Sequence, residues 1–144
     1  MHALVVAHPN PQSRTDAVAM RVARGIKSSD AHHSVEMADL SAERFDPRFT
    51  EADVALSLGQ GETPPEAAAD HARIARANAL VLVFPVYWWS FPALLKGWID
   101  RVFNQGWAYA DLDGILVKKL QHLQIHMIAL GASQRETYAR HGDL

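Results

Sequence analysis

Four short strand-like segments, separated by helical patterns, constrain the fold of this chain more than any other feature of its sequence. Apolar runs fall at residues 3–7, 79–84 and 124–130, and an alternating segment falls at residues 33–38. Helical patterns lie between them, at residues 14–27, 50–58, 66–78 and 91–104. Strands that alternate with helices in this way predict a parallel sheet with helices on both of its faces.

The composition excludes several classes of protein. The chain has 144 residues, which is enough for one domain with a buried core. Its hydrophobic content of 49% and net charge of -2 are typical of a folded domain and give no reason to expect nucleic acid binding. Without cysteine it can form no disulfide, iron–sulfur cluster or thiol nucleophile. Redox chemistry would therefore need a bound organic cofactor or a metal site without thiolates.

A long uncharged segment raises the question of a membrane span. Nineteen uncharged residues lie between Arg76 and Lys96, which is close to the length of a spanning helix. Pro85 and Pro92 interrupt this segment, and a proline inside a helix costs about 3 kcal/mol. We therefore expect a buried strand, a turn and a new helix from residue 91 that Ser90 caps, with no membrane insertion. The N-terminus lacks a basic segment and a long apolar run, so a cytoplasmic protein is expected.

Ligands of an open parallel sheet bind beyond the carboxyl ends of its strands, so the loops after the strands carry the functional prediction. The first loop holds His8 and Ser13, and Ser13 can cap the helix that follows. A helix N-terminus suits a phosphate, to which Arg14 would add a charge and Thr15 a hydroxyl. The loop has neither the glycine-rich dinucleotide motif nor a P-loop, and from this loop alone helix capping is the simpler interpretation.

The second loop has an unusual composition. Nine of the twelve aromatic residues, including all four tryptophans, lie between Phe84 and Tyr109. Tyr87, Trp88 and Trp89 fall in a predicted turn, where glycine, asparagine, aspartate or serine is usual. They indicate a stacking wall for a flat ligand or an oligomer interface, while covering the end of the core is the alternative role.

The histidines and serines form no hydrolase motif. His122 and His126 have the spacing of metal ligands only in a helix, whereas residues 124–130 are predicted to form a strand. Neither the zinc-hydrolase helix motif nor the nucleophile motif of α/β-hydrolases occurs. We therefore expect no metal site.

Residues 84–103, continued by residues 107–109, resemble the most specific sequence block of the flavodoxin-like NAD(P)H:quinone oxidoreductases. His8, Pro9 and Ser13 add to the likeness, which covers essentially the whole chain. The resemblance implies a flavodoxin-like three-layer α/β/α sandwich whose parallel sheet has the order 2-1-3-4, the fifth strand of the family being absent. It also implies bound FAD, or alternatively FMN, and a homodimer with active sites at its interface. The implied reaction passes two electrons from NAD(P)H through the flavin to a quinone.

The same resemblance implies roles for individual residues. Those that would hold the flavin are His8, Ser13, Arg14, Thr15, Pro85, Val86, Tyr87, Trp88, Trp89, Leu130, Gly131 and Ala132. Those that would line the substrate site are Tyr87, Trp88 and, in the partner subunit's pocket, Tyr109. Those that would be catalytic are Tyr138 and His141.

Two other functions stay open from the sequence. Some relatives act as ancillary subunits of glutathione-gated potassium efflux systems, and nothing in the residues excludes such a transporter partner. A flavodoxin-type electron carrier is a further alternative, although such carriers are strongly acidic and this chain has a net charge of -2. Relative to the family, residues 1–144 form a single domain that is short at its C-terminal end, so we expect the fourth strand to be an open edge.

Overall fold

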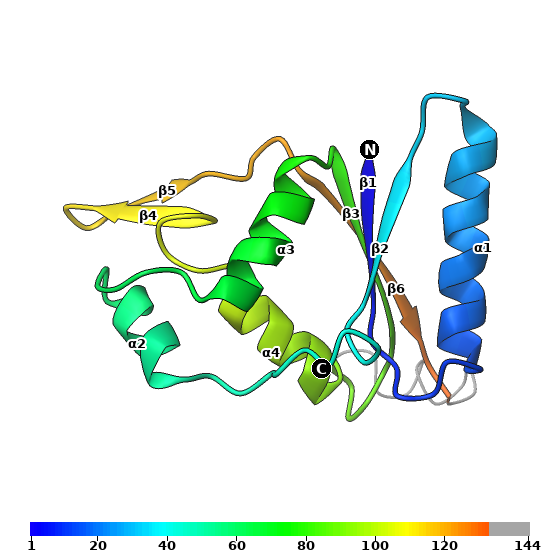
Figure 1. The fold of residues 1–144 in the computed structure, drawn as a ribbon, viewed down its shortest axis with the longest axis horizontal. Helices are drawn as coiled ribbons and strands as arrows, with labels where there is room; N and C mark the ends of the chain where they lie inside the picture. Colours follow the sequence, from blue (N-terminus) through cyan, green and yellow to red (C-terminus); the bar gives the residue numbers. More distant parts are fainter. Residues whose placement is uncertain (133–144) are drawn as a thin grey trace.

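A parallel sheet lies between two helical layers in the computed structural model, which describes residues 1–132 (Figure 1). Its strands are β1 (His2–Val6), β2 (Val35–Asp39), β3 (Ala79–Pro85) and β6 (Gln124–Leu130). They are arranged in the order β2-β1-β3-β6, and all neighbours are parallel. The predicted α/β fold and the strand order 2-1-3-4 are therefore confirmed, with β6 as the fourth strand.

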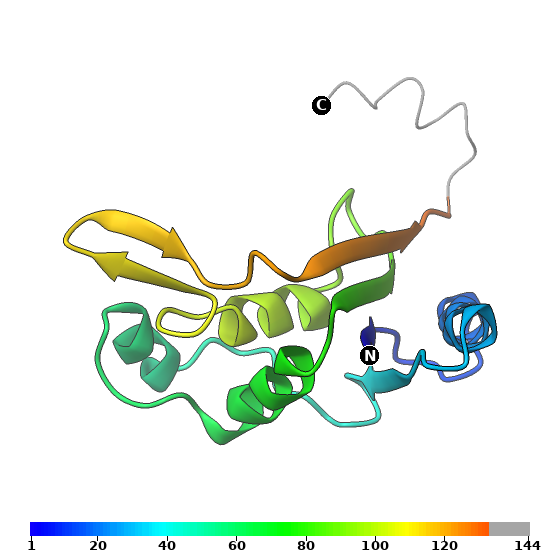
Figure 2. The same cartoon turned by 90° about the horizontal axis from the view of Figure 1, so that it is seen from above.

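Helices cover both faces of this sheet. One face carries α1 (Arg14–Ser29), and the other carries α3 (Pro65–Ala75) and α4 (Ala93–Val102), as Figure 2 shows. The short helix α2 (Glu51–Ser57) is tied to α4 by an ion pair between Asp53 and Arg101. Within residues 1–132, no helix has the length and apolar character needed to cross a membrane.

Alternate residues of β3 divide the core between the two faces. Leu80 and Leu82 belong to the buried cluster that includes Trp98 of α4, whereas Val81 and Val83 belong to the cluster under α1. Residues 79–84 are all buried, because helices cover both faces of this strand. This explains why the segment is apolar throughout rather than alternating.

The helix predicted to start at residue 91 with Ser90 as its cap begins instead at Ala93, and Pro92 is its N-cap residue. The backbone N–H of Ser90 donates to Tyr87 O (3.0 Å), and Ser90 O accepts from Tyr87 N (3.1 Å). The prediction was wrong because these two bonds hold Ser90 in the turn that precedes the helix.

A β-hairpin that the sequence analysis did not predict projects beyond α4 (Figure 1). It pairs β4 (Tyr109–Leu112) with β5 (Ile115–Lys118) in antiparallel register. Asp113 and Gly114 form its two-residue turn with φ of 54° and 82°, the positive values that a type I′ turn requires. This Asp-Gly pair was the sequence signal for the hairpin.

Strand β6 forms an edge of the sheet that residues 1–132 build, as predicted. Its side chains Ile125 and Met127 are 51% and 62% exposed, although both are large and apolar. An edge strand of this kind presents backbone groups that can pair with a further strand.

Candidate functional site

The carboxyl ends of β1, β3 and β6 lie at one edge of the sheet. Ala7 N donates to Val83 O (3.3 Å), which ties the end of β1 to β3, and Val86 N donates to Leu130 O (2.9 Å), which ties β3 to β6. The chain passes from β1 to β2 on one side, while β3 lies on the other side, so the strand order reverses between β1 and β3. Ligands of open α/β sheets bind at such a reversal. The loops that the sequence singled out therefore frame the candidate site.

The first loop ends at the N-terminus of α1, which Ser13 caps as predicted. Ser13 Oγ accepts from Asp16 N (3.1 Å), and the Ser13 hydroxyl in turn donates to the Asp16 carboxylate. The backbone N–H groups of Arg14 and Thr15 have no acceptor within the described part of the chain. Free amides of this kind make the start of a helix a binding site for anions.

The side chains of this loop differ in what they can offer an anion. Thr15 is only 3% exposed, and the Ser13 hydroxyl already has an acceptor on α1. Arg14 is exposed. His8 Nδ1 accepts from Asn10 N (3.0 Å), and in that tautomer Nε2 carries the ring proton and can donate. An anion here would therefore meet two amides, a guanidinium and an imidazole rather than hydroxyls.

The second loop is a tight turn with two tryptophans at its centre. Tyr87 and Ser90 exchange two backbone hydrogen bonds, and Trp88 and Trp89 between them have φ of 49° and 61°. Positive φ at both central positions defines a type I′ turn, which asparagine and glycine usually occupy. A side chain in this left-handed region costs roughly 1–2 kcal/mol, and such strain gathers at functional sites. Trp88 is nevertheless 96% exposed, so packing against residues 1–132 does not explain it.

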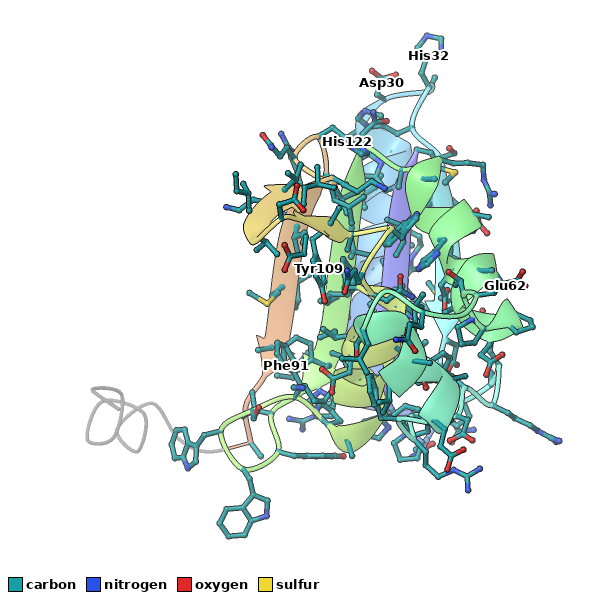
Figure 3. All side chains as sticks on the ribbon, turned by 90° about the vertical axis from the view of Figure 1, so that its left-hand side faces the viewer. Asp30, His32, Glu62, Phe91, Tyr109 and His122 are labelled. Carbon is teal, nitrogen blue, oxygen red and sulfur yellow. The ribbon has the colours of Figure 1, made fainter. Side chains whose placement is uncertain are left out.

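An apolar cavity of about 300 Å³ lies beside this turn, at the ends of β3 and β6. Its lining residues are Phe84, Val86, Trp89, Ser90, Phe91, Met127 and Ala129. Figure 3 shows Phe91 near this end of the sheet, opposite the end that carries Asp30 and His32. Met127 and Ala129 were not predicted as site residues. They face the cavity because Ala129 pairs with Phe84 and alternate residues of a strand share a face.

Known proteins resemble this chain along almost its whole length. A family model described as Flavodoxin-like fold matches residues 1–143. An uncharacterised NAD(P)H oxidoreductase of Escherichia coli is 32% identical over 142 residues, which cover 96% of this chain and 68% of that protein. The structure of NAD(P)H:quinone oxidoreductase from Methanothermobacter marburgensis is 26% identical with a TM-score of 0.86, covering 99% of this chain and 72% of that one. This chain belongs to the flavodoxin-like NAD(P)H:quinone oxidoreductase family.

The likeness extends to a mammalian quinone oxidoreductase. Ribosyldihydronicotinamide dehydrogenase (quinone) of Rattus norvegicus is 29% identical over 127 residues, which cover 77% of this chain and 54% of that protein. The family resemblance predicted from residues 84–103 is thus confirmed, and the chain spans about half to two-thirds of the length of these curated relatives.

In this quinone oxidoreductase family member, residues 130–132 at the end of β6 complete the same edge of the sheet. Pro85 and Val86 are half-buried at the end of β3, and Leu130 ends the neighbouring strand β6. Gly131 and Ala132 follow directly and are exposed. The structure therefore gathers the residues predicted to hold a flavin at one edge, from all three loops.

Three further residues were predicted to belong to the site. Tyr138 and His141, which were predicted to be catalytic, lie outside the described residues. Tyr109 is the first residue of β4 and lines a separate cavity of about 350 Å³ beside α2 and the end of α4 (Figure 3). Tyr109 is therefore absent from the lining of the cavity beside the tryptophan turn. Its predicted role in a partner subunit's pocket stays a prediction.

Proposed function

We propose that this protein is a flavin-dependent oxidoreductase that passes two electrons from NAD(P)H to a quinone or a similar flat acceptor. The observation that carries the proposal is the turn of Trp88 and Trp89, two large rings in strained backbone beside an apolar cavity at the carboxyl ends of β3 and β6. A turn that only connected β3 to α4 would be more stable with asparagine and glycine. Exposed aromatic faces next to an apolar cavity suit a flat conjugated ligand.

The start of α1 fits the phosphate end of a flavin nucleotide. The backbone N–H groups of Arg14 and Thr15 have no acceptor among residues 1–132, the guanidinium of Arg14 adds a charge, and His8 adds a donor. Charge-assisted hydrogen bonds at the positive end of a helix stabilise a bound phosphate. Ser13 supports this site by fixing the helix N-terminus, because its hydroxyl already donates to Asp16.

The other two loops fit the ring end. The exposed ring of Trp88 offers an aromatic face, and the small residues Gly131 and Ala132 allow backbone donors to approach a ligand closely. A flavin bound at this edge would supply electron transfer that the cysteine-free chain cannot perform by itself. The chain would bind and orient the reactants and exclude water from between them. We propose FAD as the cofactor, with FMN as the alternative.

We further propose that the working form is a homodimer. The apolar side chains Leu112, Ile115 and Leu116 on the β4–β5 hairpin are 59%, 68% and 62% exposed. Apolar residues gathered on one projecting element are typical of a protein interface. Tyr109 stands at the base of this hairpin, so a second chain covering the hairpin would bring Tyr109 toward that chain's own site. Sedimentation velocity tests this directly, and a monomer at all concentrations would contradict it.

The cofactor proposal is tested by adding FAD or FMN separately to the purified protein and measuring the quenching of flavin fluorescence. Arg14→Gln is expected to weaken flavin binding about tenfold, since hydrogen bonds to charged groups contribute roughly 1.5–3 kcal/mol. Arg24→Gln is the matched control, because Arg24 is an exposed residue of the same helix away from its N-terminus. A protein that binds neither flavin would refute the proposal.

The reaction is tested on the flavin-loaded protein without oxygen. Addition of NADPH or NADH should abolish the visible absorbance of the flavin, and a water-soluble benzoquinone should restore it. If NAD(P)H cannot reduce the bound flavin, the protein binds flavin without the proposed activity. If the benzoquinone cannot reoxidise the reduced flavin, quinones are excluded as the acceptor class.

A further inference from the structure

A second cavity lies away from the flavin edge, at the far end of α4. It has a volume of about 350 Å³, and its wall includes Asp53 of α2, Phe103 and Asn104 after α4, and Tyr109 of β4. The ten residues of α4 span about 15 Å, so this helix separates the cavity from the tryptophan turn at its other end. Figure 3 shows Tyr109 and Phe91 at different levels along the molecule.

Two buried acceptors in this wall have no donor among residues 1–132. Asp53 is 3% exposed, and its Oδ2 accepts from Thr50 N (2.8 Å) and Arg101 Nε (2.9 Å), whereas its Oδ1 accepts from neither. Asn104 is 9% exposed, and its Nδ2 donates to Arg101 O (3.0 Å), which fixes the orientation of the amide. Asn104 Oδ1 is therefore the second acceptor without a donor. Buried polar groups are almost always paired, so both oxygens indicate that a donor enters the cavity.

The side chains of Arg101 and Ser57 in the wall do not donate to these two oxygens. The guanidinium nitrogens of Arg101 donate, at 2.8–2.9 Å, to oxygens of Asp53, Asp46 and Glu66. Ser57 Oγ donates to a backbone oxygen of its own helix (2.7 Å). Gln105 and Tyr109 also line the wall, but neither donates to these two oxygens. The missing donor therefore has to come from outside residues 1–132, from a ligand or from water.

The remainder of the wall favours a positive charge on an apolar frame. Among the described residues of the lining, Arg101 is the one cation, and it already has the carboxylates of Asp53 and Glu66 beside it. Asp100 is a further carboxylate of the wall and pairs with Lys96, which is not part of the lining. Phe49 and Phe103 contribute aromatic rings, whose faces attract cations. Acceptors, excess negative charge and aromatic rings thus line one cavity of ligand size.

We propose that this cavity binds a small organic cation, an amidinium or guanidinium group carried on an aromatic ring. Its N–H groups would donate to Asp53 Oδ1 and Asn104 Oδ1, and its ring would lie against Phe49 and Phe103. The site is distinct from the flavin edge, and its occupation needs neither flavin nor NAD(P)H.

Benzamidinium is the probe that tests this proposal, with benzamide and benzoate as its neutral and anionic analogues. Each is titrated into the full chain at constant ionic strength by calorimetry, with backbone NMR shifts recorded in parallel. Benzamidinium should saturate one site per chain and shift the signals of Phe103 and Asn104. Benzamide should bind at least tenfold more weakly, and benzoate should not bind. Equal responses to all three probes would overturn the proposal, since the two acceptors would then be satisfied by water.

Two variants locate the binding without removing the buried ion pair of Asp53. Asn104→Leu removes one acceptor at similar volume and should weaken benzamidinium about tenfold, while Asp100→Asn removes an exposed charge and should weaken it about threefold. Glu62→Gln is the matched control, because Glu62 is exposed and lies away from Tyr109 (Figure 3). Circular dichroism verifies that each variant folds. Unchanged affinity in both cavity variants, or no saturation in the parent chain, would refute the proposal.

Discussion

His71 stacks on Trp107 with ring centroids 3.9 Å apart and ring planes 5° from parallel. His71 Nε2 also lies 2.7 Å from the carbonyl oxygen of Val102, at the end of α4. Burial lowers the pKa of His71 below its ordinary value of 6.5, although the bond to Val102 and the nearby Asp70 oppose this shift. One neutral histidine thus joins α3, the end of α4 and the segment before β4.

This stack should make the stability of the protein sensitive to mild acid. Because the pKa of His71 is lower in the folded state than in the unfolded state, the unfolded chain takes up the proton first as the pH falls through 6.5. The free energy of unfolding should therefore decrease from about pH 7.5 toward pH 5. His71→Gln retains a donor for Val102 O and should reduce this dependence in urea titrations. The exposed His32→Gln should preserve it, and equal pH slopes in all three proteins would contradict the assignment.

The tryptophan turn should lower the stability of the flavin-free chain and strengthen the binding of flavin. Replacing Trp88 by Asn and Trp89 by Gly should stabilise the flavin-free chain by about 1–2 kcal/mol, because these residues adopt positive φ without strain. The same double variant should bind flavin more weakly, since both rings are lost. Urea unfolding and flavin fluorescence measure the two effects. Asp113→Asn in the hairpin turn serves as the control, with both quantities unchanged. A destabilised double variant would mean that the rings mainly pack against the protein.

Two glycines should respond in opposite directions to the same substitution. A Cβ added at Gly97 of α4 would overlap the backbone of Pro47, so Gly97→Ala should destabilise the fold by about 2 kcal/mol or more. A Cβ added at Gly25 of α1 would meet no atom within 4 Å. Gly25→Ala should therefore stabilise the fold by about 0.5–1 kcal/mol through helix propensity. The midpoint temperature of thermal unfolding of each variant tests this prediction. Shifts of the same sign in both variants would disprove the packing argument.

Two ion pairs of similar length should differ in their contribution. Arg101 and Asp53 form a bond of 2.9 Å with both side chains 2% exposed, so Arg101→Met should cost about 3–5 kcal/mol by leaving a buried carboxylate without its partner. Lys96 and Asp100 form a bond of 2.6 Å with side chains 55% and 42% exposed. Lys96→Met should change the free energy of unfolding by less than about 1 kcal/mol. Comparable losses in urea titrations of both variants would show that burial does not govern these pairs.

The sheet was predictable because its sequence signals are local. Residues 79–84 are apolar throughout because β3 is covered on both faces, and Ser13 caps α1 as its position suggests. The start of α4 was not predictable in the same way. Both Ser90 and Pro92 are acceptable at a helix N-terminus, and only the bonds of Ser90 with Tyr87 decide between them.

The position of the candidate site in the fold was predictable from the sequence, whereas its individual contacts were not. Parallel topology alone brings the loops after β1, β3 and β6 to one edge. The burial of Thr15 depends on how α1 packs against the sheet, and no pattern in the sequence indicates it. The bond between Asp53 and Arg101 joins residues 48 positions apart, and therefore it appears only when the chain has folded.

Strand β1, the first to be synthesised, lies in the interior of the sheet between β2 and β3. Its pairing with β2 is available early, but His2 pairs with Ala79, which leaves the ribosome much later. Parallel strands brought together over such sequence distances form slowly, and unpaired strands are prone to aggregate meanwhile. Of the four strands of the sheet, β1 thus waits longest for its second neighbour. The order of synthesis, as well as the final stability, therefore determines how much of this protein reaches its native state.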